Sequence, residues 1–234
     1  MNYGNGGDFE KSGELNAAKY IRSKYNNKQP LIMFDVGANK GFYSIKLAQT
    51  FNGVPFTIHS FEPSVRTYEA LLENVGGRAG IIPNNFGLGE RKEKLKLYTN
   101  NPLSGLASFY ERRLDYIGID MSAFEEISMR TIDDYCSEKN VNHIHFLKLD
   151  IEGHELKCLA GAKNMLEQKK VDFIQFEFGG CNIDSRTYFQ DFWYLLKDKY
   201  QFYRIVKNGL VLINQYNERL EIFKNINYLV ELRP

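Results

Sequence analysis

The sequence has few cysteines and no long apolar run. Its three cysteines, Cys136, Cys158 and Cys181, are odd in number and include no CxxC pair, which argues against a disulfide framework and against a zinc knuckle. No apolar stretch approaches the roughly 20 residues that a membrane-spanning helix needs, and the polar N-terminus lacks the core of a signal peptide. We therefore expect a cytoplasmic protein with reduced, mostly buried thiols and no membrane partner.

An excess of charge of either sign is also missing. The chain has 30 Lys and Arg against 29 Asp and Glu and contains no long basic run, so nothing indicates a surface for a polyanion, and we expect no nucleic-acid partner. We find no internal repeat and no low-complexity segment. With 234 residues, of which 43% are hydrophobic and 25% charged, the chain can bury one substantial core. We predict a single domain over residues 1–234.

The most informative stretch is LIMFDVGANKGFYS, residues 31–44. Its apolar residues up to Val36 predict a buried parallel strand. Gly37 and Gly41 then predict a tight loop whose backbone lies close to a ligand. The helix that begins near Phe42 directs its amide groups and its positive end at this loop. Strand, loop and helix in this order are typical of a site for a nucleotide-like molecule.

Three residues around this loop indicate which kind of ligand it holds. Asn39 replaces the glycine at the third position of the dinucleotide fingerprint G-x-G-x-x-G, so the loop has no clear binding site for a pyrophosphate. Asp35 would repel a diphosphate but suits a cationic ligand that carries an amino acid, although a carboxylate here could also merely cap the loop. Glu62 ends the next predicted strand, at the distance where an acidic residue holds ribose hydroxyls. Together these residues favour S-adenosylmethionine over NAD.

The other segments predict an α/β fold with a doubly wound, mostly parallel sheet and an antiparallel edge strand. Residues 1–30 are expected to form an N-terminal helical flank, with a helix at 14–25. Segments 94–98 and 126–130 alternate apolar and polar residues and predict a small inserted β pair. The segment between them, 100–126, is long for a structureless connection, and we expect it to face the substrate. Further predicted elements are strands at 56–61, 81–82, 146–149, 172–178 and 227–232, helices at 65–75, 156–166 and 188–200, and a hairpin of 202–206 with 210–213.

Polar residues near the carboxyl ends of two further strands are candidate catalytic groups. A carboxylate or an imidazole within reach of an acceptor hydroxyl could take its proton, and the candidates are Asp150, Glu152, His154 and Glu177. Asp150 and Glu152 could instead cap the following helix, His154 could be a surface residue, and Glu177 could pair with a buried Arg or Lys. Asp150, Glu152 and His154 would also suit Mg²⁺ or Mn²⁺. Without a fuller ligand set we predict no metal.

Six motifs along residues 34–178 occur in the order of one known family. They are FDVGANKGFYS (34–44), FEP (61–63), GLASFYERR (105–113), TIDDYC (131–136), FLKLDIEGHEL (146–156) and QFEF (175–178). In these motifs the chain resembles the FkbM family of S-adenosylmethionine-dependent methyltransferases. The resemblance implies a Rossmann-like class I methyltransferase fold and, usually, O-methylation of a hydroxyl on a sugar or natural product. It also implies that Asp35, Gly37, Glu62 and the region of Asn85 and Phe86 surround the cofactor. We predict that the cofactor site further includes Val36, Ala38, Asn39, Gly41, Tyr43, Pro63 and Asp150.

These observations predict a methyltransferase that uses S-adenosyl-L-methionine and acts on a small-molecule or saccharide acceptor. O-methylation is the leading hypothesis. N-methylation and carboxyl methylation depend less on a base, because a neutral amine or a carboxylate is already nucleophilic. A catalytically silent nucleotide-binding scaffold of the same fold is a further alternative, and Asn39 disfavours a nicotinamide-dependent oxidoreductase. The acceptor and the oligomeric state are not indicated by the sequence.

Overall fold

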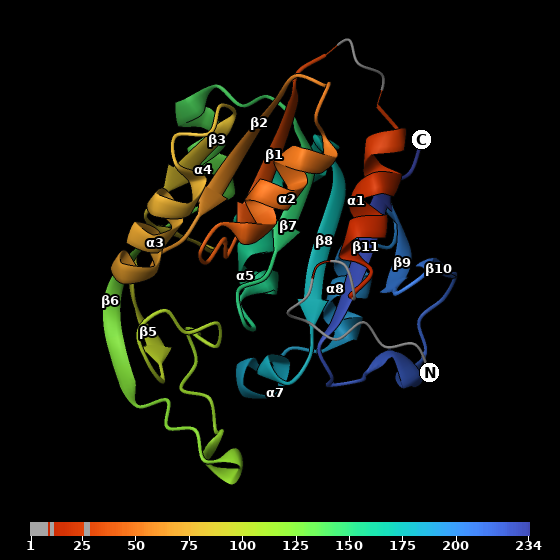
Figure 1. Ribbon diagram of the computed structural model, residues 1–234. Helices are drawn as coiled ribbons and strands as arrows, with labels where there is room; N and C mark the ends of the chain where they lie inside the picture. Colours follow the sequence, from red (N-terminus) through yellow and green to blue (C-terminus); the bar gives the residue numbers. More distant parts are fainter. Residues whose placement is uncertain (1–8, 10–11, 26–28) are drawn as a thin grey trace.

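The computed structural model describes residues 9, 12–25 and 29–234. Its central sheet contains β1 (Leu31–Val36), β2 (Phe56–Phe61), β3 (Ile81–Asn84), β7 (Ile144–Leu149), β8 (Val171–Phe178), β9 (Tyr200–Val206), β10 (Gly209–Ile213) and β11 (Ile226–Leu232). The strand order is β10-β9-β11-β8-β7-β1-β2-β3 (Figure 1). The run from β8 to β3 pairs in parallel, whereas β11 pairs antiparallel with β8 and β9, and β10 with β9. The predicted mostly parallel sheet with an antiparallel edge is therefore confirmed.

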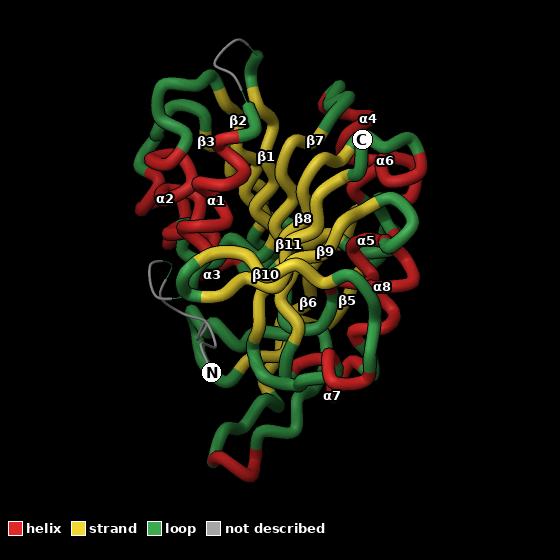
Figure 2. The backbone as a smooth tube through the Cα atoms, turned by 90° about the vertical axis from the view of Figure 1, so that its right-hand side faces the viewer, coloured by secondary structure: helices red, strands yellow, loops and turns green. Residues whose placement is uncertain are grey.

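Helices cover both faces of this sheet, as Figure 2 shows. One face carries α1 (Glu14–Ser23), α2 (Phe42–Thr50) and α3 (Val65–Val75), and the other carries α4 (Ile132–Lys139), α5 (Glu155–Ala160), α6 (Lys163–Glu167) and α8 (Phe189–Leu196). Because successive side chains of a strand point to opposite faces, the neighbours Met33 and Phe34 of β1 belong to two different cores. Each helical layer thus buries its own apolar face, which makes the fold doubly wound.

A second, smaller sheet is inserted between β3 and α4. It contains β4 (Gly87–Leu88), β5 (Lys94–Thr99) and β6 (Ala123–Arg130) in the order β4-β6-β5. The predicted antiparallel pair is β5 with β6, and β4 adds a parallel strand that is too short to show a sequence pattern. Because β6 begins at Ala123, the long connection predicted at 100–126 ends at residue 122. We call residues 100–122 the inserted loop; its only helical turn is η1 (Asp115–Ile117).

Two predicted helices differ from the structure. The helix expected at 156–166 is interrupted between α5 and α6. A Cβ atom on Gly161 would lie 1.9 Å from the carbonyl oxygen of Gly89, and the carbonyl of Gly161 accepts a hydrogen bond from the N–H of Asp133. Close approach of other backbone segments therefore breaks a pattern that looks continuous in the sequence. The helix expected at 188–200 ends at Leu196, and Tyr200 already belongs to β9.

The N-terminal flank is described only in part. Helix α1 contacts α2, β9 and β10, whereas residues 1–8, 10–11 and 26–28 of the predicted flank lie outside the described residues. Cys136, Cys158 and Cys181 are free and buried, as expected. Among residues 9, 12–25 and 29–234, no helix is both long enough and apolar enough to cross a bilayer.

Candidate active site

The loop between β1 and α2 is shaped by two glycines. Gly37 has a φ of 81°, and a Cβ atom there would lie 1.8 Å from the carbonyl oxygen of Asp150, so only glycine fits. Gly41, with a φ of 79°, precedes the first residue of α2. The N–H groups of Gly37 and Ala38 both donate to the carbonyl of Phe61, at 3.0 and 2.9 Å. This segment, residues 37–41, is the glycine loop, and its backbone is fixed between the ends of β2 and β7.

Glu62 joins the glycine loop to the end of β2. Its carboxylate accepts hydrogen bonds from the backbone N–H groups of Asn39 at 3.0 Å and Ser64 at 2.9 Å. The Asn85 side chain donates to the carbonyl oxygen of Glu62 at 2.9 Å. Burial raises the pKa of Glu62 to about 7. The carboxylate therefore stabilises the loop that the sequence assigned to the cofactor, and titrates near neutral pH.

Asp35 is directed into the protein. It is fully buried, accepts a hydrogen bond from the Ser44 hydroxyl at 2.6 Å, and lies 3.5 Å from Nζ of Lys148. The same ammonium donates to Oδ2 of Asp150 at 3.0 Å and lies 4.5 Å from the centre of the Tyr43 ring. Burial opposes the charge of Lys148, but Asp150 and Asp35 outweigh it and raise the pKa of the amine. A buried cation thus connects the carboxylates at the ends of β1 and β7.

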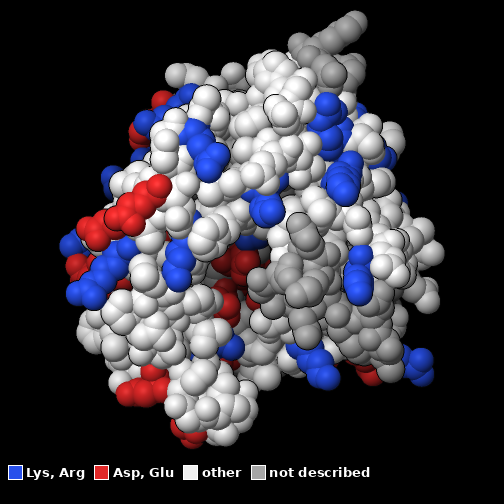
Figure 3. All heavy atoms as spheres, viewed as in Figure 1, with Lys and Arg blue, Asp and Glu red and all other residues white. Residues whose placement is uncertain are grey.

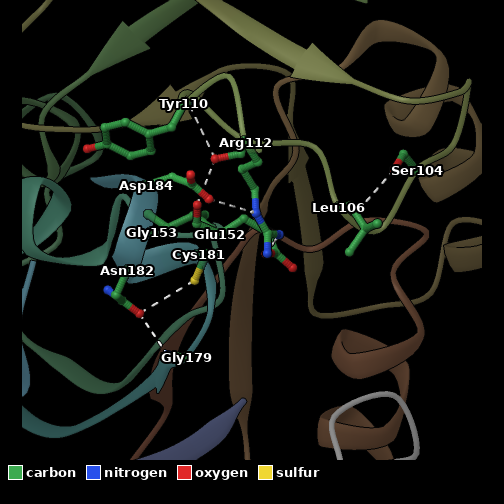
Figure 4. Close-up of polar contacts among 12 residues, drawn as sticks. Ser104, Leu106, Tyr110, Arg112, Glu152, Gly153, Gly179, Cys181, Asn182 and Asp184 are labelled. Carbon is green, nitrogen blue, oxygen red and sulfur yellow. Dashed lines mark hydrogen bonds and ion pairs between the residues drawn. The ribbon is translucent and has the colours of Figure 1, made fainter. Parts of the chain in front are cut away.

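The turn after β7 places Glu152 beside two side chains from the end of β8 and the start of α7 (Cys181–Ser185). Carboxylate oxygens of Glu152 and Glu177 and the sulfur of Cys181 lie within 4.8 Å of one another. Glu152 has a φ of 51°, a conformation that is costly for a residue other than glycine. Arg112 of the inserted loop donates to Glu152 at 2.5 Å and lies 3.7 Å from Asp184 (Figure 4). The inserted loop therefore supplies a cation to this acidic group.

Burial raises the pKa of the carboxyl groups at this end of the sheet. The pKa of Glu152 rises to about 8, with Asp150 adding to the effect of burial. That of Glu155 rises to about 7 through burial, against hydrogen bonds from the N–H groups of Ile151 and Gly153. The pKa of Glu177 lies well above its usual value for the same reason. Figure 3 shows acidic atoms on the floor of a hollow in the face viewed, a setting that favours proton uptake and cations.

His154 is separated from these carboxylates. Its ring centre lies 4.5 Å from that of Phe109, and burial lowers its pKa to about 4. It does not line the cavity that Asp150 and Glu152 line. Among the described residues, the ligand set considered from the sequence, Asp150 with Glu152 and His154, does not form a metal-binding group; Glu152 clusters with Glu177 and Cys181 instead.

Two cavities lie beside the inserted loop, and the smaller one adjoins the glycine loop. The smaller, of about 50 Å³, lies between Gly37 and Glu62 on one side and Ser104 to Phe109 on the other. The larger, of about 500 Å³, lies between the start of α3 and the inserted sheet. Ser104 and Ala107 line both cavities and so separate them. Because ligand pockets usually begin near roughly 300 Å³, we expect residues 104–109 to move when a cofactor binds at the glycine loop.

The structure divides the residues predicted for the cofactor into two groups. Five of them line the smaller cavity: Gly37, Asn39, Glu62, Pro63 and Asp150. The other seven do not line it: Asp35, Val36, Ala38, Gly41, Tyr43, Asn85 and Phe86.

Sequence reasoning missed two cations of this site. Lys148 carried a signal, since it is a lysine between Leu147 and Leu149 in a mostly apolar strand. Arg112 lies in the motif GLASFYERR, but the inserted loop has no periodic pattern from which the direction of its side chain could be inferred.

The chain is similar to known methyltransferases. The profile of the methyltransferase FkbM domain matches residues 35–205. The hexuronic acid methyltransferase AglP of Haloferax volcanii is 26% identical over 152 residues, which are 63% of this chain and 56% of that protein. The 2-O-methyltransferase NoeI of Sinorhizobium fredii is 24% identical over 176 residues, 71% of this chain and 70% of that protein.

A solved structure supports the same fold. The FkbM methyltransferase of Methylobacillus flagellatus aligns with a TM-score of 0.51 at 17% identity, and the alignment covers 97% of this chain and 56% of that one. The chain thus spans little more than half the length of this structure and of AglP. The family match covers most of the chain, including the glycine loop. The chain is therefore a member of the FkbM family of methyltransferases, and its cofactor is S-adenosylmethionine.

Proposed function

We propose that this methyltransferase transfers a methyl group from S-adenosylmethionine to a hydroxyl group of a saccharide or another small molecule. The observation that carries the proposal is a group of three carboxylates beside the glycine loop. Asp150 and Glu152 come after the carboxyl end of β7, and Glu177 lies near the carboxyl end of β8. Carboxylates can accept hydrogen bonds from several hydroxyls of one acceptor and can remove a proton from one of them.

The cofactor is expected to lie along the glycine loop. Glu62 would accept hydrogen bonds from the ribose hydroxyls, because it lines the smaller cavity just after the end of β2. Asp35 would act through Lys148 and Ser44, because it contacts both and has no exposed surface. The methyl group would then be directed toward Asp150, whose backbone touches Gly37.

Asp150 is the proposed base. Its side chain is 40% exposed, whereas Glu177 is 5% exposed and lies deeper. Lys148 holds Oδ2 of Asp150 at 3.0 Å, so the carboxylate has a fixed position at the cavity wall. In the reaction the acceptor hydroxyl would give its proton to Asp150, its oxygen would form a bond to the methyl carbon, and the bond from that carbon to the sulfonium sulfur would break. Alignment of donor and acceptor supplies most of the acceleration in such a displacement.

The acceptor class is supported by two relatives. One is named for a hexuronic acid and the other for 2-O-methylation, and both names fit an acceptor that carries several hydroxyl groups.

His154 has no role in the proposed mechanism, since its ring packs against Phe109 away from the carboxylates.

Cofactor binding is the first test. S-adenosylhomocysteine at about 100 times its dissociation constant should stabilise the protein by roughly 2.7 kcal/mol, which thermal unfolding can measure, with NAD as the control. Absence of stabilisation at millimolar S-adenosylhomocysteine would contradict the proposed cofactor site.

Methyl transfer is the second test. Formation of S-adenosylhomocysteine is followed with uronic acids, neutral saccharides, amines and carboxylic acids as acceptors. Asp150→Asn should lower kcat by about 100-fold or more, the usual contribution of a general base. Full turnover by this variant would remove Asp150 as the base. Turnover with amines alone would favour N-methylation, and binding without turnover on any acceptor would favour the scaffold.

A further inference from the structure

Glu177 is a buried carboxylate without a partner. It is 5% exposed, and within the described part of the chain no side chain or backbone group makes a hydrogen bond or an ion pair with its carboxylate. An ionised carboxylate in such a place is unfavourable unless a cation or hydrogen-bond donors compensate for it. The side chain is directed toward Glu152 and Cys181, since one of its oxygens lies within 4.8 Å of a ligand atom of each.

We infer that Glu152 and Glu177 bind a divalent cation, Mg²⁺ or Mn²⁺, next to the place proposed for the acceptor. Oxygens bound at 2.0–2.1 Å around an octahedral ion are about 3 to 4 Å apart, so small side-chain rotations would bring both carboxylates onto one ion. The site is new relative to the sequence analysis, which predicted no metal and considered His154 rather than Glu177 as a partner of Glu152.

Charge around the cluster favours a cation. Four carboxyl groups, those of Asp150, Glu152, Glu155 and Glu177, interact here, against the two cations Lys148 and Arg112. Arg112 contacts Oε2 of Glu152, which leaves the other oxygen of that carboxylate for an ion. Negative charge therefore exceeds positive charge here.

The chemistry of the side chains indicates which ions fit. Two of the three side chains in the cluster offer carboxylate oxygens, and only Cys181 offers sulfur. Two carboxylates and water suit hard ions such as Mg²⁺ and Mn²⁺ better than ions that prefer sulfur. A divalent ion here would bind an oxygen of the acceptor and make its hydroxyl more acidic, with the proton passing to Asp150. In this last point the inference rests on the proposed function.

Mn²⁺ binding to the metal-stripped full chain tests the site directly. Electron paramagnetic resonance reports free Mn²⁺, and we expect saturable binding without any acceptor present. Glu177→Gln should weaken that binding by about 100-fold, because even residues behind the direct ligands contribute 10- to 100-fold to metal affinity. Glu177→Gln keeps the size of the side chain and breaks no hydrogen bond or ion pair among the described residues, so the metal-free variant should be about as stable to heat as the parent protein, which separates loss of binding from loss of fold.

The matched control is Asp172→Asn. Asp172 forms a second candidate ligand group with His143 and His145, and Mn²⁺ binding should be unchanged in this variant. Absence of Mn²⁺ binding at millimolar concentration, equal binding by Glu177→Gln, or loss of binding in Asp172→Asn would each overturn the inference. S-adenosylhomocysteine is titrated into the same samples: its failure to bind would count against the proposed function, whereas loss of Mn²⁺ binding alone counts against the metal site.

Discussion

The glycine loop and the inserted loop face each other across the candidate site but are held in different ways. The glycine loop is fixed by backbone contacts, with two N–H groups on the carbonyl of Phe61 and with Gly37 against the carbonyl of Asp150. The inserted loop pairs with β5 through two backbone hydrogen bonds between Ser108 and Tyr98. Its contacts with the candidate site are made by side chains: the Ser108 hydroxyl donates to the carbonyl of Glu152 at 2.7 Å, and Arg112 pairs with the Glu152 carboxylate. Side chains can change without loss of the backbone path. We therefore expect the cofactor side to tolerate little variation and the acceptor side to determine the substrate.

Gly37→Ala tests the backbone contacts of the glycine loop and should have the largest effect. The new Cβ would collide with the carbonyl of Asp150 at a φ of 81°, so we expect a loss of about 4 kcal/mol in the free energy of unfolding, measured by chemical denaturation. Gly53→Ala is the control, because Gly53 has a φ of 83° but no atom within 4 Å of the added Cβ. It should cost only about 1 kcal/mol, the backbone strain alone. Equal losses in the two variants would show that the contact with Asp150 is unimportant.

The same difference explains what could be predicted from the sequence. Gly37 and Glu62 follow buried strands, so their place at the carboxyl edge of the sheet follows from periodicity, and β5 with β6 was visible as alternation. The break at Gly161 was not visible, because it depends on Gly89, which is distant in sequence. The group of Glu152, Glu177 and Cys181 could not be derived either. It depends on the left-handed turn at Glu152 and on the short helix α7, neither of which leaves a periodic pattern.

Arg112→Ala tests the inserted-loop side. The side chain is 8% exposed and that of Glu152 is 12% exposed, so the substitution leaves a buried carboxylate without its cation. We expect a loss of about 3 kcal/mol in the free energy of unfolding and a smaller change in affinity for S-adenosylhomocysteine than Gly37→Ala causes. Arg113→Ala, at an exposed neighbour, should stay within about 0.5 kcal/mol of the parent protein. A neutral result for Arg112→Ala would mean that this ion pair does not hold the loop.

Glu62→Gln tests whether Glu62 contacts the cofactor. A hydrogen bond to a charged group contributes about 1.5 to 3 kcal/mol, so affinity for S-adenosylhomocysteine, measured by titration calorimetry, should fall by about 10- to 100-fold. Glu69→Gln, on the exposed face of α3, should leave affinity unchanged. If the two variants bind alike, Glu62 does not contact the cofactor.

The pH dependence of binding gives an independent measure of Glu62. Its pKa is raised to about 7 in the folded protein, and the ionised form is the better acceptor for ribose hydroxyls. Affinity for S-adenosylhomocysteine should therefore rise as pH increases through 7 and level off above it. Glu62→Gln should remove this rise, because the amide does not titrate. A rise of equal size in the variant would assign the titration to another group.

Ser104→Ala tests the wall between the two cavities and should have the smallest effect. The Ser104 hydroxyl donates to the Asn100 side chain at 2.5 Å and accepts from the N–H of Leu106 at 3.0 Å. Loss of the hydroxyl should destabilise the closed position of the inserted loop by about 1 kcal/mol. The population of molecules with an open inserted loop should then rise by about fivefold. Cofactor association, followed by stopped-flow fluorescence, should become faster by that factor. In Ser122→Ala, at the other end of the loop, the rate should not change. Equal rates in all three proteins would mean that residues 104–109 do not control entry.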